Sequence, residues 1–226
     1  MSVSLERPIT IGVLGTHSTG KSTFVARLAH ELRLQDIDVA TVTGLGEQAQ
    51  RLGLPIAFNH TFTSTLWIIT RGISNELEAW LHADVVLVDR AVPDALGYYR
   101  AALAYRNEEP DIAAVADLES LVKAHSRHYD LMLCTTLDPS TAPGGYKIRD
   151  SHSDFRVLAD HYVSRVLHEM RLPHELLPAD GHDQALARAL AFATARLSGL
   201  HTGRSRDGPA SGAPPGERLP TPPPKE

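Results

Sequence analysis

The chemically most informative stretch of the sequence is GVLGTHSTGKSTF, residues 12–24, in which Gly15 is followed after four residues by Gly20, Lys21 and Ser22. Glycines at this spacing let backbone N–H groups turn toward phosphate oxygens, a lysine reaches the β and γ phosphates, and a serine hydroxyl ligates Mg²⁺. The pattern therefore predicts a loop that binds ATP with Mg²⁺. The predicted cofactor-binding residues are Gly15, Thr16, His17, Ser18, Thr19, Gly20, Lys21, Ser22 and Thr23, with Lys21 also catalytic and Ser22 also a metal ligand.

A loop of this kind works between a strand and a helix, and the flanking residues predict both. Residues 9–14 form a short apolar run before Gly15, which is typical of a buried strand. Phe24, Leu28 and Leu32 follow at helical spacing. The helix N-terminus would add a favourable dipole for the phosphates.

Asp89 is the second candidate, at the end of the apolar run DVVLVD. Ligands of open parallel sheets gather at the carboxyl ends of the strands, so this carboxylate is expected to face the phosphate loop. There it could hold Mg²⁺ or accept a proton from a substrate hydroxyl. A helix cap is the alternative role for Asp89, and the adjacent Arg90 is either a phosphate clamp or a surface residue.

The elements that would position these residues alternate along the chain. Long helices are expected over residues 61–81 and 152–171, the second capped by Ser151 and Asp154. The predicted strands are residues 9–14, 38–43, 84–89, 129–135 and 173–177. Alternating strands and helices predict an α/β fold with a parallel sheet covered by helices on both faces.

Composition predicts one ordinary globular domain. The chain has 226 residues, 42% of them hydrophobic and 22% charged, and a formal net charge of −5. We expect a cytoplasmic protein that binds neither nucleic acid nor membrane, because the charge is acidic and no signal or spanning segment stands out. Cys134, the single cysteine, lies in an apolar run and is expected to be a reduced core residue.

The domain is expected to cover residues 1–203. Residues 204–226 are rich in proline and poor in large apolar side chains, which predicts a disordered tail. A role for the tail as a docking peptide stays open.

Four segments together resemble the P-loop nucleoside and nucleotide kinases, specifically small AAA-type ATP-binding proteins similar to nicotinamide-riboside kinase and thymidylate kinase. The segments are GTHSTGKSTF, GEQAQR, VVLVDRAVPDALGYY and GGYKIRDSHSDFR. The resemblance covers about residues 8–198. It implies a three-layer P-loop NTPase fold whose five-stranded parallel sheet has the order 2-3-1-4-5.

The resemblance also implies how the site works. ATP would lie on the loop, Asp89 would be the acid near the phosphate acceptor, and Arg90 would contact the acceptor or its phosphate. The segment GGYKIRDSHSDFR would be a short lid whose cations are Lys147, Arg149 and Arg156, with Arg149 as the preferred catalytic cation. Solvent-exposed lid charges are the alternative, and Arg156 in particular could point to solvent.

Further acceptor-binding residues are expected beside the second and third strands. Glu47 and Arg51 are candidates, although an ion pair at i, i+4 spacing explains them equally well. Asp94 is a candidate too, and the neighbouring Tyr98 and Tyr99 could stack on a base or simply pack. The segment LPADGHD resembles the one that lines the adenine ring in such kinases, and the lack of an Asn-Lys-x-Asp motif favours ATP over GTP.

The twelve histidines form no recognisable metal-binding motif. His17 is expected to expose its ring near the nucleotide, whereas His125 and His128 are expected at a surface helix end. Mg²⁺ is the only metal we expect.

Two functions remain open from the sequence. The first is a kinase that moves the γ-phosphoryl group of ATP to a small molecule such as a nucleoside or nucleotide. The second is an ATP-hydrolysing switch that signals to a protein partner. The apolar helix over residues 61–81 could face the sheet or a second subunit, so a homodimer is also considered.

Overall fold

The computed structural model describes residues 7–137 and 153–204 and places five strands in one parallel sheet. The sheet order is β2-β3-β1-β4-β5, as predicted. The strands are β1 (Ile9–Leu14), β2 (Val39–Val42), β3 (Val85–Asp89), β4 (Leu131–Thr135) and β5 (Glu175–Leu177). The helices are α1 (Lys21–Arg33), α2 (Leu45–Arg51), η1 (Ala57–Asn59), α3 (Phe62–Ala79), α4 (Pro93–Tyr105), α5 (Ile112–Ser126), α6 (Ser153–Glu169) and α7 (His182–Arg204).

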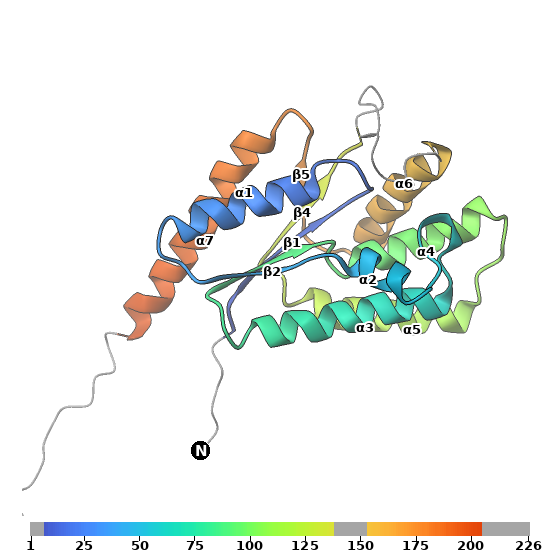
Figure 1. Ribbon diagram of the computed structural model, residues 1–226, viewed down its shortest axis with the longest axis horizontal. Coiled ribbons are helices and arrows are strands. Elements are labelled where there is room, and N and C mark those ends of the chain that lie inside the picture. The colour runs from blue at the N-terminus through green and yellow to red at the C-terminus, as the bar shows by residue number, and fades with distance from the viewer. Residues whose placement is uncertain (1–6, 138–152, 205–226) are drawn as a thin grey trace, which may run out of the picture.

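Helices cover both faces of this sheet (Figure 1). Helices α1 and α7 pack on one face, where alternate residues of β1 and β3 meet Phe24, Leu28 and the alanines of α7. Helices α3, α4, α5 and α6 form the layer on the other face. The three-layer α/β fold expected from the alternation of elements is confirmed, with the three central strands β3, β1 and β4 buried between two layers.

The central strand β1 directs its C-terminal end into the phosphate loop. It pairs with β3 through Ile9 to Val85 and Val13 to Asp89, and with β4 through Leu14 to Cys134. This register brings the C-terminal ends of β1, β3 and β4 to one edge of the sheet. Asp89 and Thr135 consequently lie beside the loop that starts at Gly15.

Several elements are one to three residues shorter than the sequence suggests. β4 begins at Leu131 rather than 129, because the Tyr129 amide closes the turn after α5 on the Ser126 carbonyl. Helix α6 ends at Glu169 rather than 171, since Arg171 has a left-handed φ of 54°. Ser151, the expected helix cap, lies outside the described residues.

Helix α4 is the most deeply buried helix of the layer that it shares with α6. Ten of its thirteen residues are buried. Gly97 faces Val163 of α6 so closely that an added Cβ would lie 2.6–2.9 Å from three Val163 atoms. The close approach of these two helices fixes the position of α4 relative to the sheet.

Helix α3 packs on the sheet and on α5, and its buried Glu76 forms a polar cluster there. Glu76 contacts the His125 Nε2 atom at 2.7 Å and accepts a hydrogen bond of 2.8 Å from the Tyr129 hydroxyl. The expectation that His125 lies at a surface helix end is therefore wrong: its ring is buried and stacks on Trp80. Polar side chains are tolerated in a core when each finds a hydrogen-bond partner.

Within residues 7–137 and 153–204, no helix combines the length and the apolar composition needed to cross a membrane. Helix α7 reaches Arg204, so nearly all of the predicted tail, residues 205–226, falls beyond the described part of the chain.

Candidate functional site

The phosphate loop, residues 15–20, connects β1 to α1. Gly20 caps α1 with a left-handed φ of 84°, a conformation that glycine adopts without steric cost. Within the described residues, the amides of residues 19–23 find no acceptor among protein groups. Unpaired amides at a helix N-terminus, backed by the helix dipole, form an anion-binding site.

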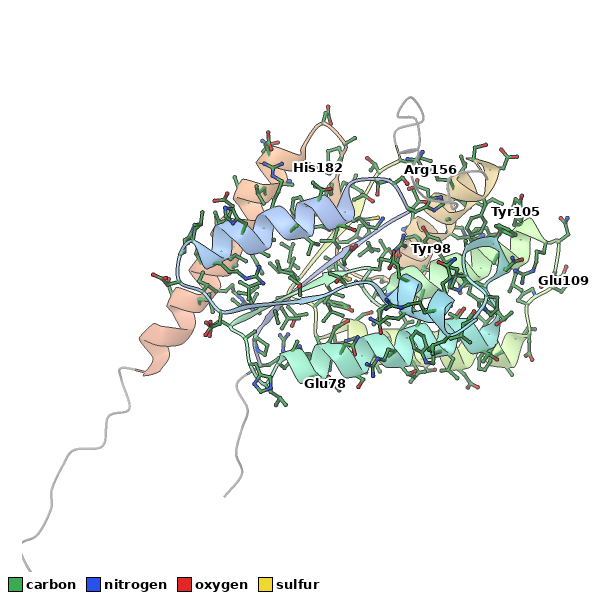
Figure 2. All side chains as sticks on the ribbon, in the orientation of Figure 1. Glu78, Tyr98, Tyr105, Glu109, Arg156 and His182 are labelled. Atoms are coloured by element: carbon green, nitrogen blue, oxygen red, sulfur yellow. The ribbon has the colours of Figure 1, made fainter. Side chains whose placement is uncertain are left out.

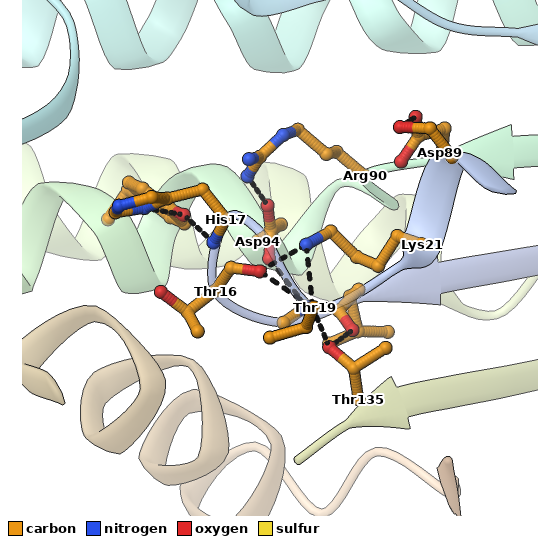
Figure 3. A network of polar contacts seen from close by, with 12 residues as sticks. Thr16, His17, Thr19, Lys21, Asp89, Arg90, Asp94 and Thr135 are labelled. Carbon is orange, nitrogen blue, oxygen red and sulfur yellow. Dashed lines mark hydrogen bonds and ion pairs between the residues drawn. The ribbon is translucent and has the colours of Figure 1, made fainter. Parts of the chain in front are cut away.

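Lys21 lies across this loop and is only 4% exposed. Its Nζ atom donates to the Thr16 carbonyl and, at 3.3 Å, contacts the Thr19 hydroxyl (Figure 3). Burial, with the nearby charge of Arg90, lowers the pKa of Lys21 from 10.5 to about 7. A bound phosphate would favour the charged lysine, because it adds negative charge to that of the nearby Asp94 and Asp89.

Ser22 and Asp89 form the oxygen pair that the sequence predicts for Mg²⁺. The Ser22 hydroxyl donates to Asp89 Oδ2 at 2.5 Å, and Asp89 is 8% exposed. The other oxygen, Oδ1, is buried and has no hydrogen-bond partner in the described part of the protein. A carboxylate oxygen without a partner beside a serine hydroxyl suits a small oxygen-loving cation, so these two residues fit Mg²⁺.

Two residues from neighbouring elements, Thr135 at the end of β4 and Arg156 on α6, hydrogen-bond to the phosphate loop. Thr135, at the end of β4, contacts the Thr19 hydroxyl at 2.7 Å and donates to the Leu14 carbonyl at 3.2 Å. Thr135 was not expected from the sequence, although its place at the carboxyl end of a strand is the signal that would have found it.

Arg156 on α6 is buried against the same loop. Its guanidinium donates to the carbonyls of His17 at 3.3 Å and Ser18 at 3.1 Å. The suggestion that Arg156 could point to solvent is wrong, because the side chain is 6% exposed. Figure 2 shows Arg156 and Tyr98 on the α6 and α4 side of the molecule.

Side chains of α4 contact the first half of the loop. Asp94 Oδ1 accepts a hydrogen bond from the Gly15 amide at 2.9 Å, while its Oδ2 accepts one from Arg90 Nη1 at 2.6 Å. The Tyr98 hydroxyl accepts from the His17 amide at 2.8 Å and contacts His17 Nδ1 at 3.1 Å. The His17 ring is therefore buried against Tyr98, and the expectation that it would be exposed is wrong.

A cavity that opens to solvent adjoins this side of the loop, and its internal volume is about 50 Å³. Its walls come from α2, the η1 segment, α3 and α4 and are mostly apolar. Its polar lining residues are His17, His60, Arg90, Asp94 and Tyr98, and its apolar ones include Leu45, Ile56, Ile68, Ile69 and Val92.

Two features give the cavity its electrostatic character. The Arg90 guanidinium lies 5.0 Å above the Tyr98 ring, and Arg90 has a left-handed φ of 76°. Burial, with the charges of Arg90 and Arg106, lowers the pKa of His60 to about 3, so this imidazole is neutral near pH 7. No sequence motif marks His60; only the fold brings it here.

The structure separates the other predicted site residues. Arg90 and Asp94 line the cavity, whereas Glu47 and Arg51 are exposed on α2, and their neighbours Leu45 and Gly46 form the wall instead. Tyr99 is buried in the core with α3 and α5. Lys147 and Arg149 lie outside the described residues.

The segment LPADGHD, residues 177–183, ends at the N-terminus of α7 close to the phosphate loop. An added Cβ on Gly20 would lie 2.7 Å from the His182 ring. That ring also meets Phe24 of α1 edge-on, with centroids 5.8 Å apart. The segment therefore lies beside the second half of the loop, where α1 begins.

Two solved structures share this fold. One is described as the NadR protein in complex with NAD and AMP-PNP and the other as the NadR protein in complex with NR; both have a TM-score of 0.59 and 17% sequence identity. The matches cover 83% and 82% of this chain but only 50% and 52% of the NadR chains. The chain thus spans about half the length of these proteins, and the similarity concerns the fold.

No curated protein sequence matches the chain at a significant level. A family model described as AAA domain matches residues 10–184, which include the phosphate loop, Asp89, the cavity and β5. The match agrees with the resemblance to P-loop ATP-binding proteins. This chain therefore belongs to the AAA-domain family, with the fold of a P-loop NTPase.

Proposed function

We propose that this protein transfers the γ-phosphoryl group of Mg·ATP to a hydroxyl of a small metabolite, a nucleoside or nucleotide, bound in the cavity. The observation that carries the proposal is that the cavity and the phosphate loop share residues. His17 belongs to the loop and lines the cavity, and Asp94 and Tyr98 line the cavity while binding loop amides. A molecule in the cavity would therefore lie directly beside the end of the triphosphate.

The nucleotide side of the proposal is supported by the amides of residues 19–23 and by Lys21. Binding of the phosphates would stabilise the charged form of Lys21, which burial disfavours in the nucleotide-free protein. The NadR protein with the same fold was solved with AMP-PNP, an ATP analogue. Ser22 and Asp89 would hold Mg²⁺, which when bound neutralises charge on the β and γ phosphates.

The acceptor side is supported by the walls of the cavity. Apolar side chains suit a flat ring, and a few polar groups suffice to orient it. Among the described residues that line the cavity, Arg90 is the one arginine or lysine, and we propose that it contacts the acceptor. A second NadR structure was solved in complex with NR.

Transfer also requires that water be kept away from the γ-phosphoryl group. We propose that residues 144–156 act as the lid and that Lys147 and Arg149 bring positive charge to the phosphates. Glu47 and Arg51, exposed on α2 beside the wall residues Leu45 and Gly46, are also proposed as acceptor contacts.

The proposal is tested by product analysis with γ-labelled ATP and a panel of nucleosides, nucleotides and pyridine ribosides. We expect a labelled metabolite from the wild type. Lys21→Ala and Asp89→Asn should each lower kcat for transfer by about 10²–10³-fold, because each removes a charge that stabilises the transition state. Thermal unfolding should remain cooperative in both variants.

Matched controls separate these effects from general loss of charge. Lys123→Ala removes an exposed lysine of α5, and Asp36→Asn alters an exposed aspartate with a left-handed φ of 57°. Both should retain wild-type transfer. Full activity in Lys21→Ala or Asp89→Asn would reject the proposed roles, and ADP formation without any labelled metabolite would favour an ATP-hydrolysing switch instead.

A further inference from the structure

Asp94 and Tyr98 of α4 each contact both the phosphate loop and Arg90. Asp94 binds the Gly15 amide with one carboxylate oxygen and the Arg90 guanidinium with the other. Tyr98 binds the His17 amide with its hydroxyl, and its ring lies under the same guanidinium. Residues four apart on a helix share a face, so one turn of α4 connects both partners. We call this pair of side chains the α4 clamp.

The clamp is rigid because its surroundings leave it little freedom. Asp94 is 2% exposed and Tyr98 is 6% exposed. Burying a carboxylate is costly unless its oxygens have hydrogen-bond partners, and both oxygens of Asp94 have one. Helix α4 itself cannot shift easily, since Gly97, between the two clamp residues, is pressed against Val163 of α6.

The clamp also determines which loop amides are available for phosphate. The amides of Gly15 and His17 point to α4 and are already satisfied. The amides of residues 19–23 have no protein acceptor in the described part of the chain. The amides in the first half of the loop therefore bind α4, and the amides from residue 19 onward remain available to bind the nucleotide.

We propose that Asp94 and Tyr98 are positioning residues that fix the distance and direction between the phosphate loop and Arg90. This inference rests on the proposed function. Both clamp residues act through Gly15, His17 and Arg90 and not by taking part in the chemistry. Phosphoryl transfer depends mainly on alignment of the acceptor with the γ-phosphoryl group, and a misplacement of about 1 Å costs on the order of 10²-fold in rate.

Tyr98→Phe is the sharpest test, because it retains the ring below Arg90 and removes only the hydroxyl that binds the His17 amide. We expect transfer to the acceptor to slow by about 10–10²-fold. The Kd for Mg·ATP should stay within about 3-fold of wild type, since the nucleotide uses other amides. Among the ADP molecules formed, the fraction accompanied by free phosphate should rise, because a misaligned acceptor lets water compete.

Tyr99→Phe is the matched control. Tyr99 is the next residue, equally buried, and packs into the core with α3 and α5 away from the loop. It should retain the wild-type ratio of transfer to hydrolysis. A purely structural role for the Tyr98 hydroxyl would lower the folded fraction without changing that ratio, which is therefore the decisive measurement.

Three results would overturn the clamp. The first is a Tyr98→Phe enzyme with wild-type transfer rate and product ratio. The second is an equal change of the ratio in Tyr98→Phe and Tyr99→Phe. If Tyr98→Phe does not fold, Asp94→Asn provides the same test from the other clamp residue, and loss of folding in both variants is the third. A wild-type protein that makes no phosphorylated metabolite rejects the proposed function itself, a result distinguishable from all three.

Discussion

Substitution of Gly20 by alanine tests whether the phosphate loop is pressed against the segment after β5. Gly20 has a φ of 84°, and an added Cβ would lie 2.7 Å from Cε1 of His182. The left-handed conformation destabilises an alanine by about 1–2 kcal/mol. The lower conformational entropy of the unfolded alanine variant offsets about 0.4–1 kcal/mol of this. Overpacking against the ring adds about 1–3 kcal/mol.

Gly53 provides a control with the same backbone and open space. Its φ is 76°, and no atom lies within 4 Å of an added Cβ. Gly53→Ala should therefore lower the free energy of unfolding by only about 1 kcal/mol. Gly20→Ala should lower it by about 2–4 kcal/mol, because the clash with His182 is added to the same backbone strain.

The assay is urea and thermal unfolding without nucleotide, repeated in a His182→Ala background. A change of 1 kcal/mol corresponds to about 2–4 °C in Tm for a domain of this size. In that background the cost of Gly20→Ala should fall to that of Gly53→Ala. Equal costs at the two glycines in the wild-type background, or a Gly20 cost that does not respond to removal of the His182 ring, would refute the reasoning.

Two further predictions concern buried ionisable groups. Because the pKa of His60 is lowered to about 3, the unfolded chain takes up a proton below pH 6.5 that the folded protein does not, so stability falls as pH drops from 6.5 toward 3. Between pH 7.5 and pH 5, the free energy of unfolding measured in urea should therefore fall by about 2 kcal/mol less in His60→Gln than in wild type. Equal decreases in the two proteins would contradict this. Glu76→Ala should lower the free energy of unfolding by about 3–5 kcal/mol, because it leaves His125 and Tyr129 without their buried partner. Glu78→Ala, an exposed change two residues further along the same helix, should cost little in the same thermal-unfolding assay, and similar Tm values for the two variants would argue against the buried cluster.

The phosphate loop could be predicted from the sequence because its chemistry is local. Gly15, Gly20, Lys21 and Ser22 lie within eight consecutive residues, so their spacing alone marks the loop, its lysine and its serine hydroxyl. Asp89 was predictable for a related reason, since a parallel sheet brings the carboxyl ends of its strands to one edge. The strand order followed from the family resemblance and not from the strands themselves.

The cavity and the α4 clamp could not be predicted, because they depend on contacts between residues far apart in the chain. Tyr98 meets His17 only after α4 packs on α6, and the sequence left base stacking and core packing open for it. His60 is buried by the same packing and carries no motif. The prediction that His125 is exposed was also wrong, because helix periodicity does not reveal which polar residue finds a buried partner.

The position of α4 has a consequence for how this protein could acquire a different acceptor. Because α4 supports the phosphate loop and also forms one side of the cavity, a substitution there alters ATP chemistry together with acceptor shape. The facing wall, with Leu45, Ile56 and Ile68, lines the cavity without supporting the phosphate loop. Changes of substrate preference, whether by evolution or in the laboratory, should therefore accumulate on the α2 to α3 side, with α4 left as the invariant frame.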